Sequence, residues 1–345
     1  MGIDRRKNLA RRLFWGAMGL PVLPEIIGRL ARSEATVFMA HRFSDPELGV
    51  PGHNPACLRS ILSQLRKRRY DLISLEELFH RVREHKSLAR AVVFTIDDGY
   101  YDAGQVAAPI FAEFDCPATI FSITEFLAGN LWLWWDKITY IFNNTKRTEI
   151  GTTLGHKQYL FDLKRHGRLE SSGVLAGACY EAPEADCAAC IAELSRAAEV
   201  ELPSLPPAAF RPLSWDEARA LQTKGISFGP HTLTHPILSH ASIEQCEREI
   251  AGSWNRLLTE VSRPVPVFCY PGGSTAHFGE REIEVLRHAG LWGAVTGNPG
   301  NALSASFESS VDEWYRIPRF HYSDSLSWIL QCVSGVEMMK ARLHA

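Results

Sequence analysis

The chain has 345 residues, of which 46% are hydrophobic and 22% are charged, and its formal net charge is −2. This composition is ordinary for a soluble globular protein and is sufficient for one large domain or two. The balanced charge argues against a nucleic-acid-binding protein, which would carry an excess of Lys and Arg, so we expect no nucleic-acid partner.

The first predicted element is a basic and apolar helical segment over residues 1–35. Five Lys and Arg residues within positions 5–12 precede a short apolar run, 13–23. That run is too short to span a bilayer, and no clean signal-peptide cleavage site follows it. A helix packed on the outside of the domain is the favoured interpretation. The alternative is a peripheral contact of residues 5–30 with an anionic membrane surface.

The remainder, residues 36–345, alternates between short apolar runs and amphipathic helical patterns. Strands are predicted at 37–39, 70–73, 91–96, 117–123, 226–228, 266–270, 292–296 and 316–320. Such alternation is typical of parallel βα units, and the number of units suits a (β/α) barrel. We therefore predict an α/β fold.

The stretch from about 124 to 210 is longer than a simple βα connection and is predicted to be an insertion. It begins with three tryptophans, Trp132, Trp134 and Trp135, and becomes helical at about 182–198. The tryptophans can stack on sugar rings, although anchoring the insertion to a core is the commoner role of such a cluster.

The eight cysteines are scattered along the chain, unlike a disulfide framework, and this favours a reducing compartment. Cys187 and Cys190 form a single CxxC pair inside a stretch of helical character. A zinc ribbon would need a second pair, and none exists. We interpret these cysteines as inert thiols.

Candidate functional residues follow the predicted strands. They are His41, Asp97, Asp98, His231, His235, Tyr270 and His321. In a βα barrel the carboxyl ends of the strands share one face, which is where active sites lie. Residues that are far apart in the sequence are therefore expected to converge.

A metal site is the favoured interpretation of the acidic pair and the histidine pair. His231 and His235 are four residues apart, which on one helical turn places both rings on the same face. One carboxylate and two imidazoles, with a position left for water, are typical of a catalytic zinc centre. The second carboxylate would then act as a base. A chain turn at Asp97-Asp98, a buried histidine pair or the iron site of an oxygenase are alternatives, but oxygenase ligands belong on a β-sandwich.

Two runs of the sequence resemble motifs of the polysaccharide deacetylase family, carbohydrate esterase family 4: 94–99 (FTIDDG) and 231–236 (HTLTHP). A looser match, 268–273 (FCYPGG), resembles a loop whose tyrosine helps to form the oxyanion pocket. The resemblance covers about residues 36–322 outside the insertion. It implies an incomplete or distorted TIM-like barrel of about seven strands, and an enzyme that removes acyl groups, usually acetyl, from sugars.

The resemblance also implies a role for each matching residue. Asp97 would be the catalytic base, and Asp98, His231 and His235 would bind a divalent metal, most simply Zn²⁺. The backbone N–H of Tyr270 would stabilise the oxyanion. Asp97 would take a proton from water that the metal activates, and a histidine would protonate the leaving amine.

Two features depart from the family pattern. The arginine that usually braces the base has no counterpart before Tyr270, and the usual Leu-x-His that carries the general acid is not clear. Two histidines are candidates for the acid: His41, which is slightly favoured, and His321. Tyr270, Arg42, Trp134 and Trp135 are the expected substrate-binding residues.

The expected partner is a carbohydrate, either an N-acetylated glycan or a lipid-linked sugar. We expect a cytoplasmic enzyme, membrane-associated or not, that acts on a glycan under assembly in exopolysaccharide biosynthesis; an exported form is the alternative. A catalytically inactive glycan-binding barrel and a deacylase of small, non-polymeric amides are the alternative functions.

Overall fold

The computed structural model describes residues 34–337. The predicted N-terminal segment, with its membrane contact at 5–30, lies outside these residues except for Glu34 and Ala35, which begin the first strand. The chain divides into two compact units, residues 1–124 with 213–345 and residues 125–212. Within the described part of the chain, no helix is both long and apolar enough to cross a membrane.

The first unit is built around a mostly parallel sheet. Its seven strands are β1 (Glu34–Ala40), β2 (Asp71–Leu72), β3 (Ala91–Ile96), β4 (Ala118–Ser122), β7 (Ile226–Pro230), β10 (Ala302–Leu303) and β11 (Phe320–His321). The order is β10-β1-β3-β4-β7, with β11 on β1 and β2 on β3, and only the β1–β10 pair is antiparallel. Every residue of β3 is buried, as expected for a strand of a parallel sheet that is covered on both faces.

A second parallel pair, β8 (Val267–Cys269) and β9 (Gly293–Val295), continues the curve of the sheet. The N–H of Val265, just before β8, donates to the carbonyl of Phe228 in β7 at 2.7 Å. On the other side, the N–H of Ile317 donates to Ala294 of β9 at 3.0 Å, and β11 then pairs with β1. These strand pairings and backbone hydrogen bonds together form the predicted distorted (β/α) barrel.

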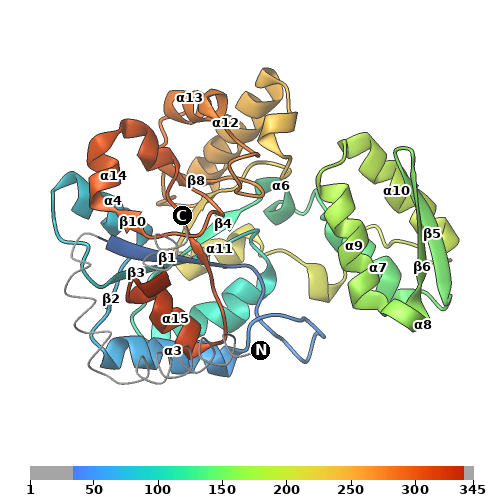
Figure 1. The fold of residues 1–345 in the computed structure, drawn as a ribbon, viewed down its shortest axis with the longest axis horizontal. Coiled ribbons are helices and arrows are strands. Elements are labelled where there is room, and N and C mark those ends of the chain that lie inside the picture. The colour runs from blue at the N-terminus through green and yellow to red at the C-terminus, as the bar shows by residue number, and fades with distance from the viewer. Residues whose placement is uncertain (1–33, 338–345) are drawn as a thin grey trace, which may run out of the picture. The chain divides into compact units, whose positions relative to one another are not determined.

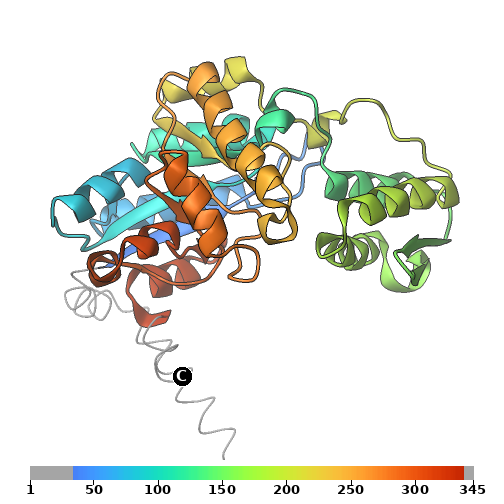
Figure 2. The ribbon, with the colours of Figure 1, turned by 90° about the horizontal axis from the view of Figure 1, so that it is seen from above.

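Helices surround this sheet (Figures 1 and 2). They are α3 (Pro55–Lys67), α4 (Leu75–Arg83), α5 (Ala108–Glu113), α6 (Thr124–Leu127, at the junction with the second unit), α11 (Trp215–Gln222), α12 (Ile243–Glu260), α13 (Glu280–His288), α14 (Ser304–Ser309) and α15 (Leu326–Val333). Their starts follow capping chemistry: Ser214 and Glu217 form a reciprocal capping box at α11, and Ser242 caps α12. The helix predicted after β3 begins with a π-helical turn, Ala103–Ala107.

The barrel interior is apolar. Its side chains come from several strands and include Val37, Val93, Phe121, Val267 and Val295. Because this core holds β1, β3, β4, β8 and β9 together, it fixes where the residues after those strands lie.

The second unit, residues 125–212, has a core of its own. It contains α7 (Trp134–Asn144), a hairpin of β5 (Glu149–Leu154) and β6 (Lys157–Asp162), α8 (Leu163–His166), α9 (Arg168–Tyr180) and α10 (Glu184–Ala197). Helix was predicted here only at about 182–198, and the hairpin was not predicted. Alternate burial of Ile150, Thr152 and Leu154 is the period-two pattern that marks a half-buried strand.

Candidate active site

The site lies in the first unit, where the ends of four strands meet. Asp97 and Asp98 follow β3, His231 follows β7, Cys269 ends β8, and Arg319 immediately precedes β11. The predicted convergence of Asp97, Asp98, His231 and His235 is what the structure shows, because their side chains lie in two overlapping clusters.

One cluster consists of Asp98, His231 and His235, whose ligand atoms lie within 4.8 Å of one another. The Nε2 atoms of His231 and His235 lie 3.6 and 3.9 Å from Oδ1 of Asp98. Nδ1 of His231 lies 2.7 Å from the carbonyl oxygen of Cys269. Since a carbonyl only accepts, Nδ1 carries the proton and leaves the Nε2 lone pair for a metal. The donor set therefore fits a divalent metal.

The histidine pair does not lie on a helical turn, so that prediction is wrong. Residues 231–235 form a loop, in which Thr232 and His235 have positive φ angles of 67° and 68°. Asp98 also has a positive φ, 75°. Non-glycine residues rarely adopt this conformation unless surrounding structure holds them there. The two rings nevertheless converge, with centroids 4.8 Å apart.

Glu249 of α12 holds this loop. Its side chain is buried, and Oε2 accepts from the N–H groups of Leu233 and Thr234 at 2.8 and 2.9 Å. Oε1 accepts from the Thr234 hydroxyl at 2.8 Å. Glu249 was not predicted to support the site. The available signal was its place on the buried stripe of α12, with Cys246, Ile250, Ser253 and Leu257.

Arg319 holds the other carboxylate, Asp97. Its Nη1 and Nη2 atoms lie 2.7 and 2.8 Å from Oδ1 and Oδ2 of Asp97, which is a two-point ion pair. Nη1 also donates to Thr95, and Nε donates to the carbonyl of Thr296. The guanidinium is 2% exposed and the carboxylate 4%. No arginine stands before Tyr270, as noted from the sequence. Arg319, immediately before β11, pairs with Asp97 instead, and this contact was not predicted.

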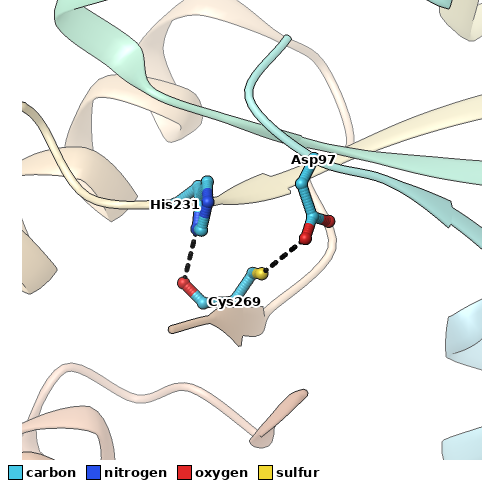
Figure 3. Close-up of side chains that lie close together, drawn as sticks. All are labelled: Asp97, His231 and Cys269. Atoms are coloured by element: carbon cyan, nitrogen blue, oxygen red, sulfur yellow. Dashed lines mark hydrogen bonds between the residues drawn. The ribbon is translucent and has the colours of Figure 1, made fainter. Parts of the chain in front are cut away.

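Cys269 forms the second cluster together with Asp97 and His231 (Figure 3). Its Sγ lies 3.5 Å from Oδ2 of Asp97 and 3.2 Å from Nη2 of Arg319, while its carbonyl accepts from His231. The side chain is fully buried. This residue stands directly before Tyr270, so a small thiol leaves room there for the arginine that reaches in from β11.

The charges of the site follow from these contacts. Burial raises the pKa of Asp97, but the charge and hydrogen bonds of Arg319 outweigh it, so the pKa lies below its ordinary value. Burial also raises the pKa of Asp98, but the imidazoles around it, first His231 and then His41 and His235, outweigh burial, so this pKa too lies below its ordinary value. Burial, with the adjacent His231, lowers the pKa of His235 to about 3. Both carboxylates are thus ionised and His235 is neutral at pH 7.

Two histidines lie near Asp97. Nε2 of His41 lies 4.0 Å from Oδ2 of Asp97, and the His41 side chain is 47% exposed. His321, in β11, is also exposed. Its pKa is lowered by partial burial and by the positive charges of His41 and Arg319.

The other residues expected to bind substrate have structural partners. The Tyr270 side chain is buried and stacks on Phe278 at 3.9 Å, and its N–H donates to Val295 at 3.4 Å. Arg42 pairs with buried Asp102 at 2.8 Å.

Trp134 and Trp135 belong to the second unit. Their rings pack edge-on with centroids 5.2 Å apart, and Trp134 also contacts the core of that unit. Their expected contact with a sugar stays a prediction.

A comparison with models of known protein families identifies one family. The family model described as "Polysaccharide deacetylase" matches residues 84–292, which is more than half of the chain. A comparison with curated proteins finds no match.

Several solved structures share the fold. The chain is 18% identical to the Streptococcus pyogenes deacetylase PplD in complex with acetate, covering 88% of this chain and 99% of that one, with a TM-score of 0.56. It is 15% identical to a polysaccharide deacetylase from Bacillus cereus, covering 88% of this chain and 69% of that one, with a TM-score of 0.53. It is 12% identical to a de-N-acetylase from Aggregatibacter actinomycetemcomitans, covering 85% of this chain and 96% of that one, with a TM-score of 0.52.

Proposed function

The chain belongs to the polysaccharide deacetylase family, and from this premise we propose that it is a metal-dependent hydrolase that removes N-acetyl groups from the sugars of a glycan. One observation supports this most directly. Beside the Asp98, His231 and His235 cluster lies a second buried carboxylate, Asp97, fixed by an arginine. A site that only bound a metal or a glycan would have no use for that second carboxylate.

The proposed cofactor is a divalent metal held by Asp98, His231 and His235. Zinc is the metal we favour, because two imidazoles and one carboxylate with an open position are its usual catalytic donor set. When bound, the metal would activate water and polarise the acyl carbonyl.

Asp97 is proposed to accept the proton of the attacking water. The carboxylate must be ionised to do so, and the Arg319 ion pair keeps its pKa below the ordinary value. The guanidinium also fixes the orientation of both oxygens, so the base needs no rearrangement before reaction.

His41 is proposed to protonate the leaving nitrogen. It is the histidine whose Nε2 lies 4.0 Å from Oδ2 of Asp97, and its partly exposed ring can reach a substrate. His321 is less suited to the role, because its lowered pKa leaves less of the protonated imidazole at neutral pH. The products are acetate and a free amino sugar, so one water is consumed for each amide bond broken.

We propose an N-acetylated polysaccharide or its lipid-linked precursor as the substrate. The family description and the names of the Bacillus cereus and Aggregatibacter proteins support an N-acetylated polymer.

The experiment measures metal content and acetate release in the same preparation of the whole chain. N-acetylated oligosaccharides are the substrates, and the adjacent carboxylates provide matched variants. Asp97→Asn should keep stoichiometric metal and lose turnover, because only the base is removed. Asp98→Asn should lose both, because a metal ligand is removed.

Each other outcome has a defined meaning. Turnover retained in Asp97→Asn would overturn the assignment of the base. Metal without acetate release from any N-acetylated sugar would contradict N-deacetylation and direct the search to other acyl groups. A protein that binds glycans with neither metal nor turnover would support the inactive glycan-binding barrel instead.

A further inference from the structure

The chain that follows β1 carries His41 and then folds back on itself in a loop, residues 42–53, which we call the β1 loop. Main-chain hydrogen bonds close this loop. The N–H of His53 donates to the carbonyl of Arg42 at 3.0 Å, and the N–H of Ser44 donates to the carbonyl of His53 at 2.9 Å. The neck of the loop, where its two ends meet, therefore lies directly after His41, and any group that holds the neck also helps to place this histidine.

A buried carboxylate, Asp102, holds the neck. Its side chain is 2% exposed. Oδ1 accepts from Nε of Arg42 at 2.8 Å, and Oδ2 accepts from the N–H of Phe43 at 2.5 Å. The Arg42 guanidinium also lies over the ring of Tyr100, with its central carbon 3.9 Å from the ring centroid. Asp102 thus uses both of its oxygens on the two residues that follow His41.

The placement of His41 depends on the backbone that carries it. Its Nε2 lies 4.0 Å from Oδ2 of Asp97, which is longer than a hydrogen bond, and its side chain is 47% exposed. On its N-terminal side the chain is fixed to the base, because the N–H of Asp97 donates to the carbonyl of Ala40 at 2.9 Å. On its C-terminal side Asp102 holds the next two residues. Segment 97–102 therefore supplies both the proposed base and the two anchors that flank the proposed acid.

We propose that Asp102 is a positioning residue for the reaction, which fixes the backbone of His41 so that the proposed acid keeps its place beside Asp97. The carboxylate is buried and acts through Arg42 and Phe43, not on the reacting atoms. A displacement of about 1 Å at a reacting group can lower a rate about a hundredfold, so a firmly held neck affects proton transfer directly. This role rests on the proposed function, in which His41 protonates the leaving nitrogen.

The test compares Asp102→Asn with the wild type, both as the whole chain. The carboxylate accepts from two donors, whereas an amide offers one oxygen and one NH₂ group, so the NH₂ group must face either the guanidinium or the N–H of Phe43. One hydrogen bond is lost without a change in side-chain size. We expect kcat for acetate release from an N-acetylated oligosaccharide to fall by about 10–100-fold, with KM and metal content unchanged. An unchanged kcat would overturn the proposal.

A second substrate separates loss of the acid from general damage to the site. The phenolate of 4-nitrophenyl acetate leaves without a proton, whereas a sugar amine must be protonated as it leaves. Asp102→Asn should therefore change turnover of this ester by less than about twofold, while turnover of the amide falls. Equal losses on the two substrates would mean that Asp102 supports the whole site and not the acid, and would overturn the proposal.

Glu282→Gln is the matched control. This carboxylate is also 2% exposed and uses its oxygens in the same way, because Oε1 accepts from Nε of Arg281 and Oε2 accepts from the N–H of Gly279, both at 2.8 Å. These contacts belong to the start of α13 and not to the β1 loop. The ratio of amide to ester turnover should stay at the wild-type value. A selective loss of amide turnover in this variant too would show that the effect is not particular to Asp102.

Gly52→Ala disturbs the same neck without changing a charge. A Cβ at this position would lie 2.6 Å from the carbonyl carbon of Arg42 and 2.8 Å from the nitrogen of Phe43, so the backbone of the neck must shift. We expect the same selective loss of amide turnover as in Asp102→Asn. Loss of both activities alike, in a variant that keeps its metal, would contradict a role of the neck in placing the acid. If Gly52→Ala folds poorly, Asp102→Asn still decides the question.

Hydrogen exchange, read by mass spectrometry, tests the contact without reference to activity. The N–H of Phe43 is bonded to Asp102 in the wild type, so the peptide that covers residues 41–54 should exchange faster in Asp102→Asn and at the wild-type rate in Glu282→Gln. Unchanged exchange in Asp102→Asn would overturn the proposal even if turnover fell. A wild-type chain that hydrolyses neither substrate would contradict the proposed function, whereas the exchange pattern would still decide whether Asp102 holds the β1 loop.

Discussion

The two halves of the active site are held in place by different means. The proposed base, Asp97, is fixed by a charge from far along the chain, since Arg319 lies 222 residues away. The loop that carries the proposed metal ligands His231 and His235 is fixed by a residue close in sequence, because Glu249 is only 15 and 16 residues from the N–H groups that it accepts from. One half therefore depends on closure of the barrel by β11, and the other on a loop and the helix that follows it.

This difference means that the halves should fail separately. Removing the Arg319 guanidinium should lower the folding stability and impair the function of Asp97 as a base, because a buried charge is left without a partner. Removing the Glu249 carboxylate should loosen the loop that carries the two histidines and weaken metal binding, because residues that support metal ligands set the orientation of those ligands. Substitutions that remove one support at a time should reveal this separation.

Arg319→Met should have the largest effect. It removes the partner of a carboxylate that is 4% exposed, and we expect a loss of about 3–5 kcal/mol in the free energy of unfolding. Acetate release should fall to background, because burial then raises the pKa of Asp97 unopposed by the guanidinium. Chemical denaturation and turnover measure the two effects.

The double variant Asp97→Asn with Arg319→Met is the control. Removing both charges should restore part of the stability that Arg319→Met loses, since no uncompensated charge stays buried. A double variant as unstable as the sum of the single variants would show that the ion pair is not what links the two strands.

His41→Asn should have the next largest effect, a fall in turnover of about 10²–10⁴-fold, typical for loss of a general acid. Metal content should be unchanged, because His41 lies outside the Asp98, His231 and His235 cluster. His321→Asn is the matched variant and should lose less. The reverse ranking would assign the acid to His321.

Glu249→Gln should weaken metal binding by about 10–100-fold, the usual cost of removing a group that supports a metal ligand. The side chain keeps its size but loses the charge that holds the N–H groups of Leu233 and Thr234. Competition with a metal chelator measures the affinity without reference to activity. Glu247→Gln, exposed on the same helix, is the control and should leave the affinity unchanged. Equal metal affinities in the two variants would show that Glu249 does not support the metal ligands.

Cys269→Ala should have the smallest effect. It removes the thiol contacts to Asp97 and Arg319 but keeps the carbonyl that accepts from His231, since that group is backbone. A thiol is a weak donor and a weak acceptor, so we expect its two hydrogen bonds together to be worth about 0.5–1.5 kcal/mol. Turnover should therefore fall by about tenfold or less, and metal content should not change. A larger loss, measured at saturating metal, would mean that the thiol has a part in the chemistry itself.

The sequence contained most of the fold because its strands are continuous apolar runs and its helices begin with capping residues. The strand at 91–96 and the helix that begins after Ser242 are observed with those bounds or nearly so. The metal cluster was also predictable, because Asp98, His231 and His235 each follow a strand of a parallel barrel.

The supporting roles of Arg319 and Glu249 were not predicted, and the reason is physical. Periodicity shows which residues are buried, but it does not show which partner a buried charge finds. Arg319 beside an apolar strand and Glu249 on an apolar helix stripe both break the pattern of their own element. Such a polar residue is tolerated only when a partner satisfies it, so each exception marked a contact outside its own helix or strand, and the periodicity does not specify the other end of that contact.

The position of Arg319 has a consequence for the order in which the protein becomes competent during synthesis. The ribosome has made the proposed base by residue 97 and the last proposed metal ligand by residue 235, but the guanidinium that fixes Asp97 emerges more than 80 residues later. A nascent or prematurely terminated chain that ends before β11 therefore holds every predicted ligand, yet its Asp97 has no arginine to orient it. Hydrolysis is expected to begin only after Arg319 has been made, so products truncated before it should capture metal without turning over substrate.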